Sequence, residues 1–305
     1  MRVAVVDIGT NSTRLLVAEV DGAVSELERR TTVTRLGRGV DVSGQLAAEA
    51  IEDVCETIGR YIDLYRPLEP DRVEVIATSA VRDASNSGAF VAELRERFAL
   101  DARILDGSEE ARLTYLGATA GREPADGTLV VDIGGGSTEL IVGSGPRMDF
   151  HASLEIGVVR HTERHISSDP PSAAELEALA TEVIRLIFAE LREGRTPHAD
   201  LGIAVAGTPT SLAAIDQELD PYDPERVHGY RLSLETVQRL CSVLSAMPLV
   251  ERREVTGLHP DRAPTIVAGI VILIQVMRAF GLREVEVSEQ DLLHGAALDA
   301  AKNAA

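Results

Sequence analysis

The sequence VVDIGTNSTRLLVA at residues 5–18 recurs almost unchanged as VVDIGGGSTELIVG at residues 130–143. The two stretches align without a gap, and nine of the fourteen positions are identical. Each copy is an apolar run that ends in an aspartate, followed by a short polar, Gly-rich turn and a second apolar run. This pattern predicts a β-hairpin. The repeat therefore indicates two halves of the chain that are built on the same hairpin.

The turn of each hairpin has the composition of a phosphate-binding loop. Backbone N–H groups and hydroxyls in such a turn can surround an oxyanion, and the preceding aspartate can hold a divalent cation directly or through water. One copy alone would be explained equally well as a strand with an ordinary turn. The matched pair favours two phosphate loops that face one another across a cleft.

Composition excludes several classes of protein. The chain has 305 residues, of which 45% are hydrophobic and 26% charged, which is typical of a globular protein large enough for two domains. Its net charge of −19 argues against nucleic acid as a partner. Lys302 is the only lysine, so neither a Walker-A loop nor Schiff-base chemistry is expected. Phosphate must then be bound by arginine, hydroxyls, backbone and metal.

The remaining bulk features indicate a cytoplasmic protein. Cys55 and Cys241 lie far apart without metal-ligand spacing and are expected to be reduced core residues. The N-terminus leads directly into a strand, which leaves no room for a signal peptide. The longest apolar stretch, residues 265–277, is too short to span a membrane and predicts a buried helix. The sequence leaves open whether the chain forms a homodimer.

Hydrophobic periodicity places strands and helices in a twice-repeated order, which predicts an α/β protein with two similar domains. The main helices are expected at residues 46–65, 88–98, 158–165, 173–191, 233–244, 264–280 and 290–301, with further helices after residues 108 and 207. The domains are expected at residues 1–124 and 125–305, with a hinge at 121–127. The helix at 290–301 would pack either on the second domain or back on the first.

Two further segments complete a family pattern. They are TSAVR at residues 78–82 and GSEEARL at residues 107–113, and they lie between the two hairpins. In this order and spacing the four segments resemble the exopolyphosphatase/guanosine pentaphosphate phosphatase (Ppx/GppA) family, within the actin-like and sugar-kinase-like ATPase superfamily. The resemblance covers essentially the whole chain. It implies two actin-like, ribonuclease H-like domains with an interdomain cleft, and hydrolysis of phosphoanhydrides.

The resemblance assigns roles to the hairpin residues. The first loop matches the family's phosphate-1 motif and the second its phosphate-2 motif, and the carboxylates beside them are expected to hold Mg²⁺, with Mn²⁺ as a substitute. The expected phosphate-binding residues are Gly9, Thr10, Asn11, Ser12, Thr13 and Arg14 in the first loop, and Gly134, Gly135, Gly136, Ser137 and Thr138 in the second. The expected metal ligands are Asp7, Asp132 and Glu139.

The catalytic residues are expected between the hairpins. Adjacent helical residues point about 100° apart, so only one of Glu109 and Glu110 can face a substrate. The family's general base maps to Glu110, which would orient and deprotonate the attacking water. The alternative is that both glutamates only favour the helix N-terminus electrostatically. Arg82 matches the family's substrate-binding arginine, although an isolated arginine after a strand is usually a surface residue.

Several other polar residues are less informative. Arg35 and Arg38 would either extend the anionic track or lie solvated in a loop. Gly207-Thr208, between a strand and a helix, resembles the third loop of the superfamily. The spacing of His161 and His165 suits a metal pair on one helix, but no third ligand lies in a His-Glu-x-x-His arrangement, so surface or capping roles are favoured.

The sequence thus predicts a Mg²⁺-dependent exopolyphosphatase that releases terminal phosphate from inorganic polyphosphate. The alternatives are a guanosine pentaphosphate phosphohydrolase, a non-hydrolysing polyphosphate or nucleotide sensor, and an ATP-dependent kinase of the same superfamily. A kinase would need a catalytic aspartate, and the sequence offers no convincing one outside the hairpins. A protein that only binds phosphate would gain nothing from a carboxylate such as Glu110 near the terminal phosphate. Longer relatives carry an added helical domain, so we expect short polyphosphate chains to be used at least as well as long ones.

Overall fold

The computed structural model describes residues 1–123, 125–191 and 197–303. These residues form two compact units. Unit 1 consists of Met1–Arg122 and Asp291–Ala305, and unit 2 of Glu123–Gln290. The domain boundary expected from the sequence lies at 124/125, and Pro124 of the expected hinge lies outside the described residues.

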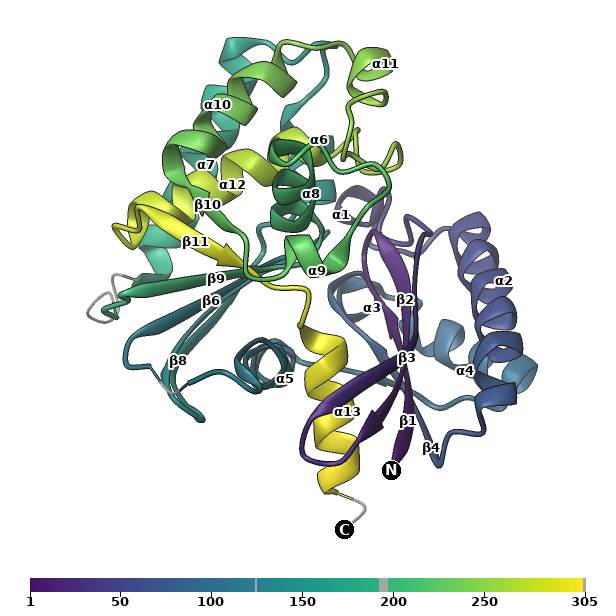
Figure 1. The fold of residues 1–305 in the computed structure, drawn as a ribbon. Helices are drawn as coiled ribbons and strands as arrows, with labels where there is room; N and C mark the ends of the chain where they lie inside the picture. Colours follow the sequence, from purple (N-terminus) through teal and green to yellow (C-terminus); the bar gives the residue numbers. More distant parts are fainter. Residues whose placement is uncertain (124, 192–196, 304–305) are drawn as a thin grey trace. The chain divides into compact units, whose positions relative to one another are not determined.

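Unit 1 is built on a five-stranded sheet in the order β3-β2-β1-β4-β5 (Figure 1). The first hairpin of the repeat supplies β1 and β2, which pair antiparallel, and β3 continues the meander. β4 and β5 extend the sheet in parallel on the other side of β1. The strands are β1 (Arg2–Ile8), β2 (Ser12–Val20), β3 (Val24–Val33), β4 (Arg72–Ala77) and β5 (Ala102–Ile104).

Both faces of this sheet are covered, which explains why its central strands are continuous apolar runs rather than alternating ones. Alternate residues of β1 point to opposite faces. Ala4 and Val6 join the core beneath α2 and α4, whereas Val3 and Val5 join the core beneath α5 and α13. The helices are α1 (Val40–Ser43), α2 (Ala48–Tyr65), the 3₁₀ turn η1 (Arg66–Leu68), α3 (Ser79–Asp83), α4 (Ser87–Phe98), α5 (Gly107–Thr119) and α13 (Leu292–Lys302).

Helices α5 and α13 approach one another at backbone distance. A Cβ placed on Gly117 would lie 1.9 Å from the carbonyl oxygen of Asp291, and one on Gly295 would lie 1.8 Å from that of Leu113. Only glycine fits at either position, because any larger residue would separate the helices. This crossing attaches the last helix of the chain to α5 and to β1 (Figure 1).

Unit 2 repeats the same strand order with one added edge strand, β10-β11-β9-β6-β7-β8. Its second copy of the hairpin supplies β6 and β7, and β8 continues the meander, while β9 and β11 extend the sheet in parallel. The strands are β6 (Thr128–Ile133), β7 (Thr138–Ser144), β8 (Arg147–Leu154), β9 (Leu201–Val205), β10 (Arg231–Ser233) and β11 (Glu284–Val287). The expectation of two similar α/β domains is confirmed.

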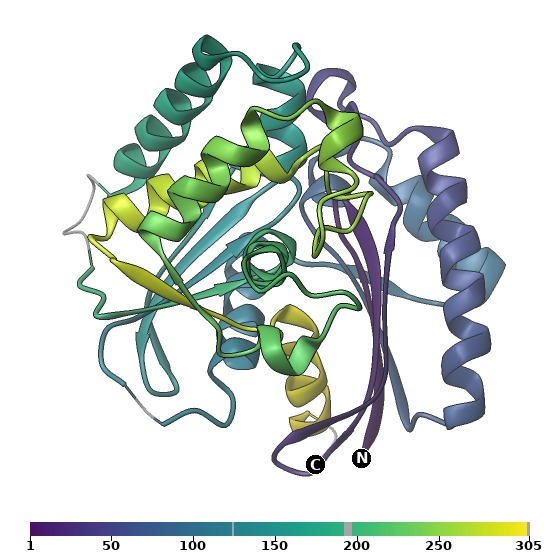
Figure 2. The same ribbon diagram turned by 45° about the horizontal axis from the view of Figure 1, so that its top comes forward.

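The core of unit 2 centres on α12, whose residues from Ile266 to Met277 are all buried. Helices α7 and α10 pack against α12, as Figure 2 shows for the teal, green and yellow helices above the sheet. The apolar stretch at 265–277 is therefore a buried helix, as predicted. Within the described ranges, no helix combines the length and apolar character that a membrane span needs. The helices are α6 (Val158–His165), α7 (Ala173–Leu191), α8 (Gly207–Asp216), α9 (Pro224–Val227), α10 (Leu234–Ser245), α11 (Leu249–Arg252) and α12 (Ile266–Ala279).

Candidate active site

The two hairpin turns share one backbone geometry. The Gly9 N–H donates to the Ser12 carbonyl at 3.0 Å, and the Gly134 N–H donates to the Ser137 carbonyl at 3.0 Å. A Cβ on Gly9 would lie 3.0 Å from the Ser12 oxygen, and one on Gly134 would lie 3.1 Å from the Ser137 oxygen. Contacts this short require glycine at both positions. The repeat in the sequence is therefore also a repeat in structure.

The first loop is held by the segment that follows β3. The Asn11 carbonyl accepts hydrogen bonds from the N–H groups of Thr34 and Arg35 at 3.1 and 2.9 Å, and the Thr10 carbonyl accepts one from Gly37 at 2.8 Å. These hydrogen bonds tie the carbonyl side of the loop to this segment.

Two of the expected phosphate-binding threonines make contacts inside unit 1. The Thr10 hydroxyl accepts the Ala80 N–H at 3.2 Å. The Thr13 hydroxyl is fully buried and lies 3.0 Å from the hydroxyl of Thr34. Asn11 and Ser12, at the tip of the turn, are only half-buried. Of the polar side chains in this loop, those two are the more accessible to a ligand.

The second loop is held by the first turn of α6. The Val158 N–H donates to the Gly134 carbonyl at 3.0 Å, and the Val159 N–H donates to the Gly135 carbonyl at 2.9 Å. The Arg160 Nε donates to the Gly136 carbonyl at 2.9 Å. Within the described residues no hydrogen bond uses the N–H groups of Gly135 and Gly136. These donors are thus available to an anion, as expected for a nest of consecutive glycines.

Two other residues position the second loop. The Thr138 hydroxyl is fully buried and donates to the Ile156 carbonyl at 2.5 Å. Gly157 packs directly on the loop, because a Cβ on it would lie 2.2 Å from the Gly135 carbonyl oxygen. Thr138 therefore fixes the end of the turn from inside the protein.

The carboxylate of the first hairpin is paired with arginine. Asp7 lies opposite Arg14 in the β1–β2 register, and its Oδ2 accepts from Arg14 Nε at 2.8 Å and Nη2 at 2.7 Å. Arg14 Nη1 also donates to Asp291 at the N-terminus of α13. Burial raises the pKa of Asp7 more than Arg14 lowers it. Burial also opposes ionisation of Asp291, but Arg14, Arg29 and His294 together lower its pKa.

One oxygen of Asp7 has no partner. Oδ1 is buried and makes no hydrogen bond within the described part of the chain. Such an orphaned acceptor costs roughly 1–3 kcal/mol. A bound cation, or a hydrogen bond from a water molecule, would satisfy this acceptor.

The second hairpin carries two carboxylates at the equivalent positions. Asp132 lies opposite Glu139 in the β6–β7 register, and both are buried. The Ser153 hydroxyl donates to Glu139 Oε1 at 2.9 Å. Paired residues of adjacent strands lie about 5 Å apart at Cβ, so two carboxyl groups are held close together. Oxygen donors of this kind suit a hard divalent cation.

The structure distinguishes the two adjacent glutamates of α5. Glu110 is 6% exposed, and its Oε2 accepts from Arg82 Nη1 at 2.9 Å. The same Arg82 nitrogen donates to the Leu105 carbonyl at 2.8 Å. Glu109 instead points outward and pairs with Arg103. Glu110 is therefore held inside unit 1, whereas Glu109 lies at its surface.

Burial changes the chemistry of Glu110. Desolvation raises the pKa of its carboxyl to about 7, against the opposing effect of Arg82, and the charge of Asp7 raises it further. A carboxylate with a pKa near the working pH is suited to accept a proton during a reaction.

Comparisons with known proteins identify the family of the chain. The family model described as "Ppx/GppA phosphatase family" matches residues 15–304. The chain belongs to this family. It is 34% identical over 315 residues to exopolyphosphatase 2 of Mycobacterium tuberculosis, covering 98% of both chains. Membership of the Ppx/GppA family confirms the expected enzyme class, a phosphoanhydride hydrolase.

Solved structures of Ppx/GppA proteins have the same fold. An exopolyphosphatase-like protein superposes with a TM-score of 0.94 at 34% identity, covering 100% of this chain and 99% of that one. The Ppx/GppA family member of Aquifex aeolicus superposes with a TM-score of 0.84 at 30% identity, covering 100% and 98%.

Four other residues named from the sequence of this Ppx/GppA protein lie outside the two hairpin turns and the Glu110–Arg82 pair. Arg35 is half-buried in the segment that supports the first loop, and Arg38 is exposed. Gly207 begins α8, and its carbonyl accepts from Arg262 Nη1 at 3.2 Å. The Thr208 side chain is buried against α12, where it occupies the space beside Gly269.

The contact between Asp291 and Arg14 was not predicted from the sequence. The two residues are 277 positions apart, and no motif links them. The helical pattern at 290–301 was the local signal in this segment. Asp291 does cap α13, since its Oδ1 accepts the Leu293 N–H at 3.0 Å.

Proposed function

We propose that this Ppx/GppA protein is a Mg²⁺-dependent exopolyphosphatase, in which Glu110 activates water to attack the terminal phosphate of inorganic polyphosphate. The observation that carries the proposal is the state of Glu110, a buried carboxylate with a raised pKa beside Arg82. A structural glutamate at a helix N-terminus would be expected at the surface, as Glu109 is.

Glu110 acts as the general base in this proposal. Its carboxylate orients a water molecule in line with the scissile bond and takes a proton from it as the new P–O bond forms. Arg82 holds the carboxylate in place through Nη1. Its Nε and Nη2 make no hydrogen bond within the described residues, so they are free to bind an oxygen of the transferred phosphate.

The loops bind phosphate oxygens mainly through backbone. In unit 2 the N–H groups of Gly135 and Gly136 supply donors, and in unit 1 Asn11 and Ser12 supply accessible polar side chains. Arg14 is already bonded to Asp7 and Asp291, so we assign it a positioning role rather than direct binding of phosphate.

The donors expected for Mg²⁺ fit a hard cation. Asp132 and Glu139 would hold it in unit 2, and in unit 1 Asp7 Oδ1 is a buried acceptor without a protein partner. All three supply carboxylate oxygens, the donors that Mg²⁺ and Mn²⁺ prefer. When bound, the cation would neutralise phosphate charge in the transition state.

Polyphosphate is favoured over guanosine pentaphosphate because few aromatic rings are exposed. A guanosine base needs a stacking platform or hydrogen bonds to its edge. Four rings on helices with a predicted core-facing side are covered, Tyr61, Tyr65 and Phe90 fully and Phe98 in part. The markedly exposed rings in the described chain are Phe188 and Tyr222. The Tyr222 hydroxyl is bonded to Glu289. The similarity to a protein named exopolyphosphatase 2 supports the same substrate.

Phosphate release from three substrates tests the proposal. The purified chain would be given polyphosphate, guanosine pentaphosphate and ATP with Mg²⁺, and kcat/KM would be compared. Polyphosphate should be preferred. A value for guanosine pentaphosphate more than about tenfold higher, equivalent to roughly 1.4 kcal/mol, would reverse the substrate assignment.

The matched pair of glutamates tests the mechanism. Glu110→Gln should bind substrate but lose about 10²–10⁴-fold in kcat. Glu109→Gln, one residue away on the exposed side, should retain normal turnover. If Glu109→Gln lost activity while Glu110→Gln retained it, the assignment of Glu110 as the general base would be wrong.

A further inference from the structure

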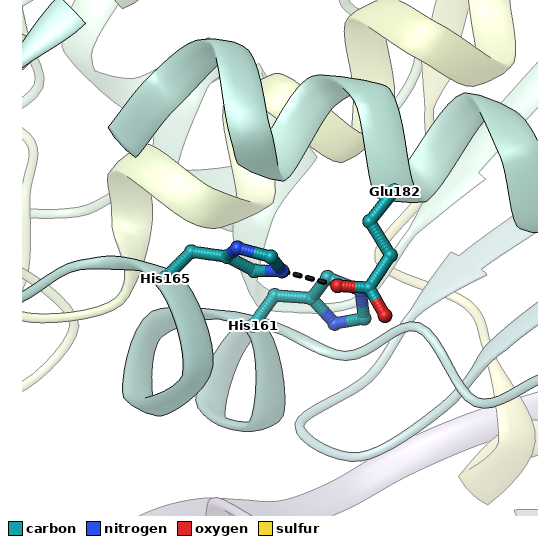
Figure 3. Close-up of side chains that lie close together, drawn as sticks. All are labelled: His161, His165 and Glu182. Atoms are coloured by element: carbon teal, nitrogen blue, oxygen red, sulfur yellow. Dashed lines mark hydrogen bonds and ion pairs between the residues drawn. The ribbon is translucent and has the colours of Figure 1, made fainter. Parts of the chain in front are cut away.

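We propose that His161, His165 and Glu182 form a second metal site in unit 2, one that takes a transition-metal cation such as Zn²⁺. The ligand atoms of these three residues all lie within 4.8 Å of one another. Figure 3 shows both imidazole rings beside the Glu182 carboxylate. The set is separate from the carboxylates assigned to Mg²⁺, and it does not depend on the proposed function.

The fold supplies the third ligand that the sequence pattern lacked. His161 and His165 are four residues apart on α6, which places them on one helix face. Their ring centroids are 5.7 Å apart. Glu182 comes from the middle of α7, which packs against α6. Two imidazoles and one carboxylate match the donor set of open, three-ligand zinc sites, which leave a fourth position for water.

His161 has a buried nitrogen without a partner. The residue is fully buried, and its Nε2 makes no hydrogen bond within the described ranges. The sequence favoured a surface or capping role for this residue. Its Nδ1 does accept the Gly157 N–H at the start of α6, but the ring is buried rather than at the surface. Capping explains one nitrogen, and Nε2 remains to be explained.

Two of the three side chains have the charge that metal binding requires. Burial lowers the pKa of His161 to about 4, so its imidazole is neutral at physiological pH. Burial opposes ionisation of Glu182, but hydrogen bonds from His165 and Arg164 lower its pKa, so the carboxylate is charged. Arg164 Nη1 binds Glu182 Oε1 at 2.9 Å, while His165 contacts Oε2. A cation at the site would replace the contact between His165 and Oε2.

Metal binding at His161 Nε2 has a consequence for the second phosphate loop. In the metal-free ring the Gly157 N–H donates to Nδ1 at 3.3 Å, so the proton of the neutral ring lies on Nε2. A metal on Nε2 requires this proton to move to Nδ1, which breaks the bond from Gly157. Gly157 packs on Gly135, and therefore the site is coupled to the loop that offers N–H groups to phosphate.

Isothermal titration with ZnCl₂ in excess Mg²⁺ tests the site, because Mg²⁺ saturates the all-oxygen donors. Wild-type protein should bind one Zn²⁺ per chain. His165→Gln and Glu182→Gln should each weaken binding at least about tenfold, as expected for loss of a ligand. His198→Gln and Asp200→Asn, which alter an exposed His–Asp pair of the same unit, are the matched controls and should leave binding unchanged.

Two further readouts address folding and the identity of the donor atoms. Co²⁺ should give the visible absorption of a tetrahedral site in wild type and lose it in His165→Gln, a half-buried position where substitution leaves the core intact. Hydrogen exchange of the Gly157 amide should accelerate when Zn²⁺ binds. Absence of Zn²⁺ binding in wild type, or equal binding in His165→Gln and Glu182→Gln, would overturn the proposal. Unchanged exchange at Gly157 would overturn the assignment of His161 Nε2 as a ligand.

Discussion

The two hairpins have the same turn geometry, but the side chain opposite the aspartate is basic in one and acidic in the other. In both, a glycine N–H closes the turn onto a serine carbonyl at 3.0 Å. The residue opposite the aspartate differs, since Asp7 faces Arg14 and Asp132 faces Glu139. The first pair joins a carboxyl group to a guanidinium group, whereas the second brings two carboxyl groups together. One difference in a repeated frame thus places a cationic side chain in the first hairpin where the second has an acidic one.

The supports of the two loops also differ. Carbonyls of the first loop accept hydrogen bonds from an irregular segment that contains Thr34, Arg35 and Gly37. Carbonyls of the second loop accept them from the first turn of α6. A helix is the more rigid support, because its own hydrogen bonds resist displacement. We therefore expect the second loop to tolerate less change in its neighbours.

The largest expected effect concerns metal dependence. Asp132→Asn should raise the Mg²⁺ concentration for half-maximal activity by at least about 100-fold, since loss of even a supporting partner of a metal ligand costs 10–100-fold. Asp7→Asn should raise it less, because Arg14 already occupies one of its oxygens. Activity measured across a Mg²⁺ titration decides this, with exposed Asp149→Asn as control. If Asp7→Asn and Asp132→Asn raised the required Mg²⁺ concentration equally, the two hairpins would not differ in how they bind the cation.

The next effect is on stability. Arg14→Gln leaves the buried carboxylates of Asp7 and Asp291 without their cation and should lower the free energy of unfolding by about 3–5 kcal/mol. Urea denaturation measures the change. Arg30→Gln, an exposed arginine of the same sheet that pairs with Glu28, should change stability by less than about 1 kcal/mol. Similar values for both variants would show that the first hairpin is not held by its internal ion pair.

Two glycines test the difference in loop support. In Gly157→Ala the new Cβ would lie 2.2 Å from the Gly135 carbonyl oxygen, so backbone must move. In Gly37→Ala it would lie 2.2 Å from the Thr10 Cγ2, which is a side-chain atom rather than backbone. Displacement of a binding group by about 1 Å can cost roughly 100-fold in rate. We expect kcat/KM to fall by more than about tenfold in Gly157→Ala and by clearly less in Gly37→Ala. The reverse order would contradict the assignment of α6 as the more rigid support.

The smallest effect is a shift in pH dependence that belongs to unit 1. Glu110 must be ionised to accept a proton, so at saturating Mg²⁺ activity should rise with pH up to its pKa of about 7 and fall about tenfold per unit below it. Arg82→Gln removes a charge that lowers this pKa, so the acid limb should move to higher pH. Arg103→Gln, which affects the partner of Glu109, is the control and should leave the limb in place. If the acid limb of the pH–activity profile did not shift in Arg82→Gln, the limb would not report ionisation of Glu110.

Sequence predicted best what local pattern encodes. The repeat predicted matching strands in both units, and the alignment of Arg14 with Glu139 already contained the charge difference between the hairpins. Helix 158–165 was located at its observed bounds. Helix α2 begins at Ala48 rather than residue 46, and its N-cap, Ala47, makes no side-chain cap. A helix start without a capping residue gives no sequence signal.

Contacts between distant segments were not predictable from pattern. Asp291 binds Arg14, and Glu182 lies beside His161, because separate elements pack together, and neither contact has a local motif. Adjacent Glu109 and Glu110 could be separated only by the family resemblance until their burial was known. The roles assigned to the site residues remain predictions for the experiments above.

The glycine crossing of α5 and α13 bears on how the chain is synthesised. The helix that carries Glu110 completes its packing only against residues 291–303, which leave the ribosome after the whole of unit 2. At about 5–20 residues per second, the nascent N-terminal sheet waits roughly ten seconds or more with this apolar face covered by α5 alone. Unit 2 is continuous in sequence and can fold first. The helix that carries Glu110 therefore completes its packing only after unit 2 has been synthesised, and a chain interrupted before residue 291 leaves part of this sheet face exposed.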